Sequence, residues 1–321
     1  MTEPSVAPFA APWWARSPHV QTLWPHLARR VPRPPLSRER LTLPDGDFLD
    51  CDWLTGGPDQ GPLLLILHGL EGSSDSAYVR GLLAVCHSRR WRAVVAHFRG
   101  CSGEPNRRAR SYHCAVTDDL EAIIGHLRGR TNTLSAVGYS LGGAVLLNWL
   151  AERGHDAPLK AAAAVSVPYD LHCAARRLDH GFSRVYQYGL LRQVKRSLRR
   201  KRALYGVPDV PPLSTLRTFR VFDNAVTAPV HGFHDVDHYY THASPLPKLR
   251  AICVPTLLVQ AIDDPFLGRE CLPTTAHLPS SVRLEVTAHG GHVGFVYGRY
   301  PWAPRYWLDE RLAAFFSDSL G

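Results

Sequence analysis

Short, continuously apolar runs recur along this chain at intervals that suit a layered α/β domain. Those with the composition of buried strands span residues 63–67, 93–97, 134–137, 162–167, 256–259 and 283–287. Helical patterns separate several of them, notably over 77–87 and 116–127. Because a strand without polar alternation is buried on both faces, the pattern predicts an α/β fold: a mostly parallel sheet with helices on both sides.

The strand pattern lapses in two places, and these lapses predict the domain organisation. Residues 1–40 are rich in Pro, Arg and Trp with little periodicity, which indicates an N-terminal arm packed on the core. Residues 170–244 have room for helices but no clear core strand, which predicts an inserted helical cap. The α/β core then consists of residues 41–169 and 245–321.

One segment of the expected cap is strongly basic. Between Arg192 and Arg202, seven Lys and Arg residues alternate with apolar residues at helical spacing, which predicts an amphipathic helix. A solvated helix face is the simplest interpretation, and peripheral contact with an anionic lipid surface or a phosphate-bearing substrate is the second.

Composition narrows the class of protein. The 321 residues, 45% of them hydrophobic, suffice for one large domain with an insertion. The longest apolar runs fall far short of the roughly 18 residues that a membrane span needs, so no transmembrane segment is expected. The first residues lack the basic start and apolar run of a signal peptide, and we expect a cytoplasmic protein.

The net charge and the cysteines exclude further classes. A formal charge of +9 alone does not indicate nucleic-acid binding, and no zinc-finger or RNA-recognition pattern accompanies it, so no nucleic-acid partner is expected. The seven cysteines include no C-x-x-C pair, and their odd number argues against a full disulfide framework. We therefore expect reduced thiols, no metal and no cofactor.

The strongest chemical signal is a G-x-S-x-G motif. Residues 138–142 read Gly-Tyr-Ser-Leu-Gly, directly after the 134–137 strand and before a helical run. This is the context in which a tight turn pushes a serine outward as a nucleophile. A serine that merely caps a helix is the alternative, but the preceding strand favours Ser140 as a catalytic residue.

A nucleophilic serine needs a base and an acid to orient that base. His292 stands in a glycine-rich loop, Gly-Gly-His-Val-Gly, after the last expected strand. In enzymes with this serine turn, the acid lies between serine and histidine in sequence, where Asp263 and Asp264 follow the 256–259 strand. We favour Asp264, which directly precedes a proline as the acid commonly does in related loops, and Asp263 stays open.

Acyl transfer also needs donors for the oxyanion. These are commonly the amide after the nucleophile and an amide after an early strand. Here they are Leu141 and Leu70, the latter in the His-Gly-Leu-Glu-Gly segment over 68–72. An ordinary strand-to-helix turn is the alternative for this segment.

These motifs resemble the YheT-like family of α/β-hydrolases over nearly the whole chain. The matching segments are 18–23, 68–72, 98–107, 138–143, 177–186, 222–233 and 263–266. The resemblance implies the α/β-hydrolase fold with an inserted cap and a triad of Ser140, Asp264 and His292. Eukaryotic relatives in this group are membrane-anchored lipid hydrolases and ester-forming acyltransferases, and this sequence lacks their N-terminal apolar anchor.

A histidine-rich stretch offers a competing chemistry. His231, His234, His238 and His242 lie beside Asp235 and Asp237, and a helix would bring His238 and His242 to one face, as metal ligands require. A polar cap surface is the alternative interpretation, and the family resemblance implies no metal.

The sequence therefore predicts a serine hydrolase that cleaves short- to medium-chain or lipid-like carboxylic esters, including acylglycerols. The alternatives are an alcohol O-acyltransferase with the same triad and a non-catalytic ligand-binding protein of the same fold.

Overall fold

An eight-stranded sheet runs through the centre of the computed structural model, which describes residues 6–205 and 210–320. Its strands, in spatial order, are β1 (Leu36–Thr42), β2 (Phe48–Leu54), β4 (Arg92–Ala96), β3 (Leu63–Leu67), β5 (Leu134–Tyr139), β6 (Ala162–Val165), β7 (Thr256–Ala261) and β8 (Val282–Thr287). The six strands from β3 to β8 pair in parallel, whereas β1 and β2 form an antiparallel edge. A small separate ribbon pairs β9 (Val296–Tyr297) with β10 (Arg305–Tyr306).

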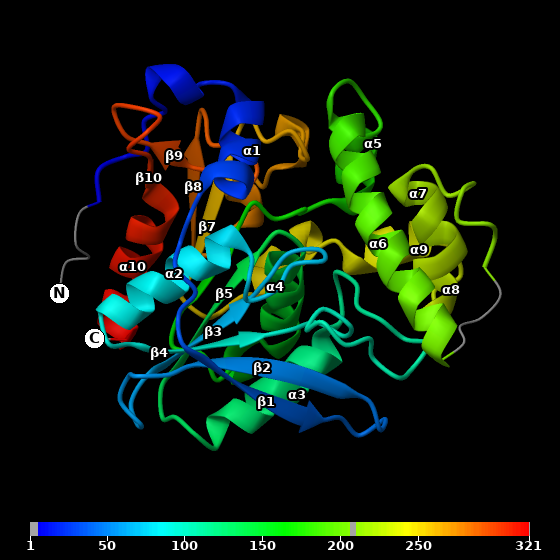
Figure 1. Cartoon of the computed structure of the whole chain (residues 1–321), viewed down its shortest axis with the longest axis horizontal. Coiled ribbons are helices and arrows are strands. Elements are labelled where there is room, and N and C mark those ends of the chain that lie inside the picture. Colours follow the sequence, from blue (N-terminus) through cyan, green and yellow to red (C-terminus); the bar gives the residue numbers. More distant parts are fainter. Residues whose placement is uncertain (1–5, 206–209, 321) are drawn as a thin grey trace.

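Helices cover both faces of this sheet (Figure 1). Helices α2 (Ala77–Ser88) and α10 (Trp307–Leu320) pack on one face, and α3 (Thr117–Arg128) and α4 (Leu141–Arg153) pack on the other. Strand β3 explains the two cores: Leu63, Leu65 and Leu67 join the cluster with α3 and α4, whereas Leu64 and Ile66 join the one with α2 and α10. The mostly parallel, doubly covered sheet predicted from the apolar runs is confirmed.

Regular structure begins earlier than the sequence indicated. Each of the expected apolar runs corresponds to a strand within about two residues. The N-terminal region, however, contains a short 3-10 helix η1 (Trp13–Ala15) and helix α1 (Pro18–Ala28), and β1 starts before residue 40. Strands β1 and β2 were missed because their charged residues hide them: Asp50 and Asp52 on β2 pair with Arg40 and Arg38 on β1.

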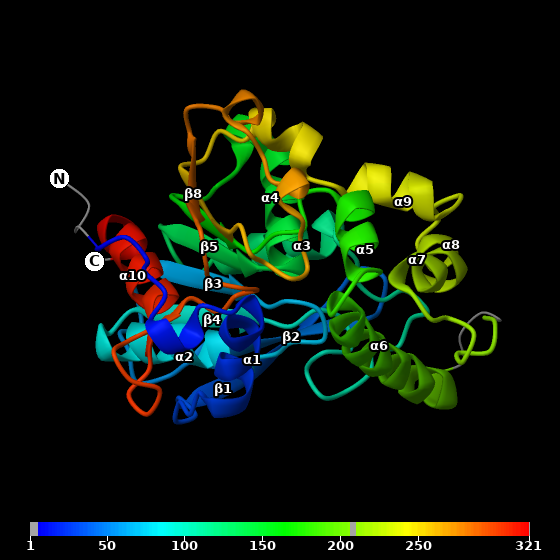
Figure 2. The same ribbon diagram turned by 90° about the horizontal axis from the view of Figure 1, so that it is seen from above.

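Between β6 and β7 the chain forms a group of helices at one side of the sheet (Figure 2). They are α5 (Leu171–Leu178), α6 (Ser183–Tyr205), α7 (Phe219–Phe222), a π-helical turn η3 (Asp223–Thr227), α8 (Ala228–Val230) and α9 (Val236–Ala243). Strands β6 and β7 are direct neighbours, so this group interrupts the sheet's connectivity without adding a strand. The remaining short 3-10 helices are η2 (Gly154–Asp156), η4 (Leu246–Ala251), η5 (Arg269–Cys271) and η6 (Thr275–His277).

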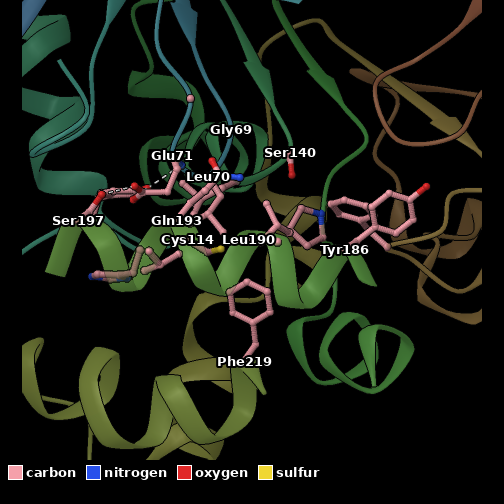
Figure 3. A pocket seen from close by; sticks show the side chains of 18 of the residues that line it. Gly69, Leu70, Glu71, Cys114, Ser140, Tyr186, Leu190, Gln193, Ser197 and Phe219 are labelled. Atoms are coloured by element: carbon pink, nitrogen blue, oxygen red, sulfur yellow. Dashed lines mark hydrogen bonds between the residues drawn. The ribbon is translucent and has the colours of Figure 1, made fainter. Parts of the chain in front are cut away.

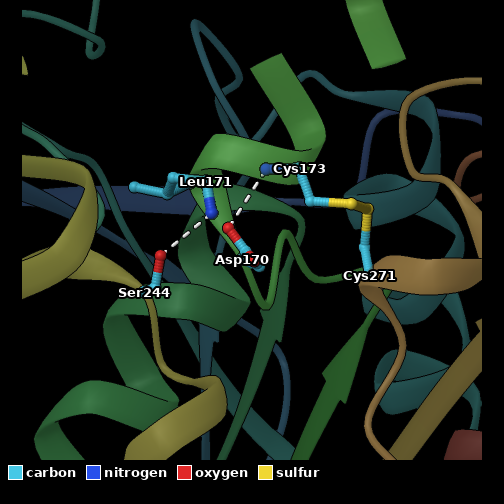
Figure 4. Close-up of a disulfide and its surroundings, with 5 residues drawn as sticks. All are labelled: Asp170, Leu171, Cys173, Ser244 and Cys271. Carbon is cyan, nitrogen blue, oxygen red and sulfur yellow. Dashed lines mark hydrogen bonds between the residues drawn. A yellow bond between two sulfur atoms is a disulfide. The ribbon is translucent and has the colours of Figure 1, made fainter. Parts of the chain in front are cut away.

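The two ends of this group are tied to each other. The Leu171 amide donates to the Ser244 hydroxyl at 2.9 Å (Figure 4), and the Leu246 amide donates to the Tyr169 carbonyl at 3.0 Å. Both contacts lie at the limits that we propose for the cap, residues 170–244. Within the described residues, no helix is long and apolar enough to cross a membrane.

The expectation that all cysteines are reduced thiols is wrong for one pair. Cys173 on α5 and Cys271 in η5 form a disulfide (Figure 4), and the five other cysteines are free. The two partners are 98 positions apart and meet because α5 packs beside the loop that follows β7. Sequence spacing gives no sign of a contact of this kind.

Candidate active site

The turn from β5 to α4 presents Ser140 to solvent. Ser140 has φ 50° and ψ −118°, and its amide donates to the Val165 carbonyl at 2.8 Å. The flanking backbone is tightly packed: a Cβ atom on Gly142 would lie 2.4 Å from the His68 carbonyl oxygen, and one on Gly138 equally close to that of Gly142. A left-handed backbone at a residue other than glycine costs about 1–3 kcal/mol and persists only where the surroundings enforce it.

The side chains of Ser140, His292 and Asp264 form one hydrogen-bonded series. The Ser140 hydroxyl donates to Nε2 of His292 at 3.0 Å, and Nδ1 of the same ring donates to Asp264 at 2.9 Å. The imidazole is stacked on Phe266, with ring centroids 4.0 Å apart. The sequence-predicted residues therefore lie within hydrogen-bonding distance, in the order that acyl transfer requires.

The two adjacent aspartates have different partners. The Asp264 side chain is fully buried and also accepts hydrogen bonds from the Phe266 amide at 2.8 Å and from Gln260 at 3.2 Å. Asp263 instead accepts from the Gly291 amide at 2.9 Å, and burial raises its pKa. The geometry favours Asp264 as the partner of His292.

Helix α1 holds the loop that contains His292. The Thr22 hydroxyl accepts a hydrogen bond from the His292 amide at 3.0 Å. The buried Gln21 accepts from the Val296 amide at 2.7 Å and donates to the Val296 carbonyl at 2.9 Å. A Cβ atom on Gly294 would lie only 2.2 Å from the Gln21 carbonyl oxygen, which explains why this loop is rich in glycine.

Sequence reasoning missed these supporting residues. Residues 18–23 stood out only as part of the family resemblance, since no local pattern indicates a contact across 270 positions. The N-terminal region, expected to be an arm, thus supports the loop that contains His292 through Gln21 and Thr22.

The loop after β3 presents the second expected oxyanion donor. Among the described residues, neither the Leu70 amide nor the Leu141 amide donates a hydrogen bond to another group. His68 fixes the loop, because its Nδ1 donates to the Gly69 carbonyl at 2.7 Å while its Nε2 accepts from the Phe98 amide at 3.2 Å. Burial lowers the pKa of His68 to about 3, so the ring is neutral and keeps this pattern.

Ser140 opens into a cavity of about 820 Å³ between the core and the proposed cap (Figure 3). Helix α1, the loop after β3 and helix α6 all contribute to its wall. Much of the lining is apolar, with Leu190, Val194, Phe219 and Phe222 from the cap side. The volume and lining are typical of a site for a small, largely apolar molecule.

The histidine-rich stretch does not gather metal ligands. His238 accepts a hydrogen bond from the His234 amide at 3.2 Å, and the His231 ring packs against His113 with centroids 4.4 Å apart. In the part of the chain that the structure describes, the group of close ligand atoms is Cys173, Glu270 and Cys271, and its two cysteines form the disulfide.

Comparison with known proteins identifies what the chain is similar to. A family model described as "alpha/beta hydrolase fold" matches residues 62–298. "Putative esterase YheT" of Escherichia coli (strain K12) is 43% identical over 92% of this chain and 88% of its own length. "Phospholipase ABHD3" of Homo sapiens is 30% identical over 90% of this chain and 73% of its own length.

Further similarities extend the same pattern. A "Monoacylglycerol lipase" of Saccharomyces cerevisiae is 30% identical over 85% of this chain and 61% of its own length. Among solved structures, the Pyrococcus furiosus esterase Pf2001 aligns with a TM-score of 0.55 at 15% identity, covering 99% of this chain and 100% of that one. At that identity the structural likeness supports the fold alone, and it agrees with the fold class expected from the sequence.

Proposed function

Since this chain belongs to the α/β-hydrolase family, in its YheT-like branch, we propose that it is a carboxylic ester hydrolase that works through an acyl-serine intermediate. The observation that carries the proposal is the hydrogen-bonded series from Ser140 through His292 to the buried Asp264. The names of its relatives as an esterase, a phospholipase and a monoacylglycerol lipase point in the same direction.

In the first half of the reaction, the Ser140 oxygen forms a bond to the ester carbonyl carbon while its proton moves to Nε2 of His292. Asp264 accepts the Nδ1 proton as a hydrogen bond and stabilises the imidazolium that results. The carbonyl electrons move to oxygen, and the Leu70 and Leu141 amides donate to this oxyanion. Loss of a single such donor typically costs about 10²- to 10³-fold in kcat.

Collapse of the tetrahedral intermediate breaks the bond to the alcohol, which takes the proton from His292 as it leaves. In the second half, water attacks the acyl carbon and gives its proton to the same nitrogen. The Ser140 oxygen then leaves, recovers the proton, and releases the carboxylic acid. The stack of Phe266 on His292, with centroids 4.0 Å apart, keeps the ring in one plane throughout.

The substrate class that we propose is a short- to medium-chain or lipid-like ester, including acylglycerols. Contact of an acyl chain with the apolar part of the cavity wall contributes about 0.8 kcal/mol for each buried CH₂ group. Peripheral contact with a membrane surface through the basic helix α6 would give access to such esters. We also propose a cytoplasmic location. The disulfide argues against it, because disulfides are rare in that compartment.

Active-site labelling tests the proposal directly. A fluorophosphonate probe should label the native protein at Ser140, as located by peptide mass spectrometry, and the Ser140→Ala variant should lose the label. Ser88→Ala, which removes an exposed hydroxyl on α2, is the matched control and should keep it. Folded protein that takes no label would favour the non-catalytic binding protein.

Product analysis separates hydrolysis from acyl transfer. With an octanoate ester as substrate and added ethanol, the proposed hydrolase releases mainly octanoic acid. Predominant formation of ethyl octanoate would instead identify an alcohol O-acyltransferase that uses the same acyl-serine intermediate.

A further inference from the structure

A carboxylate without a cationic partner lines the cavity beside Ser140. It belongs to Glu71, in the loop after β3, and it extends away from the serine toward helix α6 (Figure 3). Leu70, whose amide we assign to the oxyanion, immediately precedes it in sequence. Because the Leu70 and Glu71 residues line the same cavity of about 820 Å³, one substrate molecule can reach both the oxyanion donor and this carboxylate.

Both hydrogen-bond donors to Glu71 are neutral hydroxyl groups. The Tyr112 hydroxyl donates to Oε1 at 2.8 Å, and the Ser197 hydroxyl, on α6, donates to Oε2. Within the described residues Glu71 forms no ion pair, and its carboxylate accepts no further hydrogen bond. Because an ionised carboxylate offers about four acceptor sites, roughly half of its capacity is unused.

The backbone also keeps Glu71 in place. Its φ of 53° lies in the left-handed region, which is unfavourable for a residue other than glycine or asparagine. The Glu71 amide donates to the same Tyr112 hydroxyl at 2.8 Å, so one tyrosine holds both the backbone and the side chain. The carboxylate is thus fixed at one position in the wall.

The surroundings of Glu71 differ from the apolar part of the cavity wall. Gln193 lies beside it on α6 and forms no hydrogen bond with another described residue. An alkyl chain packed here would remove water from a charged group and supply no hydrogen bond in return, which is strongly unfavourable. The polar part of a substrate fits this place, and the acyl chain fits the apolar wall.

We propose that Glu71 is a specificity-determining residue that binds the alcohol part of the ester through a hydroxyl or ammonium group. This inference rests on the proposed ester hydrolase function. It assigns the side of the cavity that contains the Glu71 carboxylate to the leaving alcohol. Esters of polyols or amino alcohols are then preferred over plain alkyl esters of the same acid.

The test compares three octanoate esters: ethyl octanoate, 1-octanoylglycerol and octanoylcholine. The variant is Glu71→Gln, which keeps the shape of the side chain and its ability to bond both hydroxyls but removes the charge. For 1-octanoylglycerol, which donates a hydroxyl, and for octanoylcholine, which offers a positive charge but no hydrogen-bond donor, we expect the ratio of kcat/KM to that of ethyl octanoate to fall about tenfold, the value of one contact with a charged group. The loss should appear mainly in KM, because the contact exists before the reaction starts.

Two variants separate recognition from a structural bridge between loop and cap. Ser197→Ala removes the bond to α6 and keeps the carboxylate, so the preference should persist. Glu152→Gln makes the same chemical change at an exposed position on α4 outside the cavity and should leave all three esters unaffected. A larger fall for octanoylcholine assigns the site to an ammonium group, and a larger fall for octanoylglycerol assigns it to hydroxyls.

The inference is overturned if Glu71→Gln slows all three esters by one common factor, or if Ser197→Ala abolishes the preference equally. Failure of the proposed function looks different, since the native protein would then hydrolyse none of the esters and take no fluorophosphonate label.

Discussion

Two neighbouring aspartates differ in what they contact, and this separates their expected effects. Asp264→Asn replaces the acceptor for Nδ1 of His292 and favours the wrong tautomer, so kcat should fall by about 10⁴-fold. Asp263→Asn alters only contacts to Gly291 and His289, and kcat should change by less than about tenfold. Steady-state hydrolysis of a soluble ester measures both, and the reverse ranking would assign the orienting role to Asp263.

Asp223, in the π-helical turn η3, lines the cavity with its buried carboxyl group. Burial raises its pKa from 3.8 to about 6, although Thr227 and Tyr240 donate hydrogen bonds to it. The folded protein therefore holds a proton that the unfolded chain has lost between these values. The contribution of Asp223 to the free energy of unfolding should therefore fall as pH rises through this window, by about 2 kcal/mol from pH 4.5 to 7.

The Asp223→Asn variant isolates this contribution, because it cannot ionise. Relative to the native protein, its free energy of unfolding should increase by about 2 kcal/mol between pH 4.5 and 7. Urea unfolding at both values provides the measurement. An equal difference at the two pH values would show that Asp223 ionises normally in the folded protein.

At the scale of elements, α1 acts on the site through the loop that carries His292. Thr22→Val keeps the shape of the side chain and removes the acceptor of the His292 amide. Because misplacement of a catalytic group by about 1 Å costs up to about 10²-fold, kcat should fall ten- to a hundredfold. Thr22→Ser retains the hydroxyl and should restore kcat, whereas a purely packing role would make the serine variant as poor as the valine one.

Helix α6 carries a row of unpaired cations on its outer side. Arg184, Arg192, Lys195, Arg196 and Arg199 form no ion pair within the described residues. Burial and repulsion from Arg199 and Arg217 lower the pKa of Lys195, which agrees with a cluster of like charges. The exposed apolar side chains of Val185 and Tyr188 lie on the same helix.

We therefore expect α6 to bind anionic vesicles. Each Lys or Arg close to such a surface contributes about 1 kcal/mol, so replacing Arg192, Arg196 and Arg199 by Glu should weaken binding more than a hundredfold. Cosedimentation with phosphatidylglycerol vesicles measures this, with phosphatidylcholine vesicles for comparison. The control reverses three exposed arginines elsewhere: Arg89, Arg128 and Arg269. Equal losses of vesicle binding in the two variants would show that net charge, and not the position of the cations on α6, determines the binding.

The elements that could be predicted from sequence are those whose signal is local. Strand β3 consists entirely of Leu and Ile, and its neighbours in the sheet are similarly apolar. The missed strand β2 contains Asp50 and Asp52, which are buried because arginines on β1, together with Ser102, Ser74 and His97, pair with them. In a single sequence, a charged residue predicts an exposed position, even where a tertiary contact neutralises its charge and buries it.

In the candidate site too, only the residues with a local sequence signal could be predicted. The spacing of motifs led to Ser140, His292 and the Asp263–Asp264 pair, and the structure places His292 within hydrogen-bonding distance of both Ser140 and Asp264. Supporting residues such as Gln21 and His68 carry no signature of their own. Their positions depend on packing between distant segments, which pattern reasoning does not reach.

For the molecule as a whole, the disulfide between Cys173 and Cys271 ties the proposed cap to the core. It closes a loop of 98 positions, for which the chain-entropy account gives about 4.7 kcal/mol of stability, while disulfides typically contribute about 2–4 kcal/mol. Dithiothreitol should therefore lower the Tm of the native protein. The double variant Cys173→Ser with Cys271→Ser should melt at that lower Tm and be insensitive to the reductant. An unchanged Tm on reduction would show that the bridge does not form in solution.

The bond between Thr22 and His292 also bears on when the proposed triad can assemble. Thr22 and Ser140 precede His292 by 270 and 152 positions, so a ribosome makes α1 and the serine turn well before the loop that contains this histidine. Contacts between such distant segments form late, because the entropy of closing a long loop opposes them. The proposed triad can therefore be completed only after the loop with His292 has been made and has docked on α1.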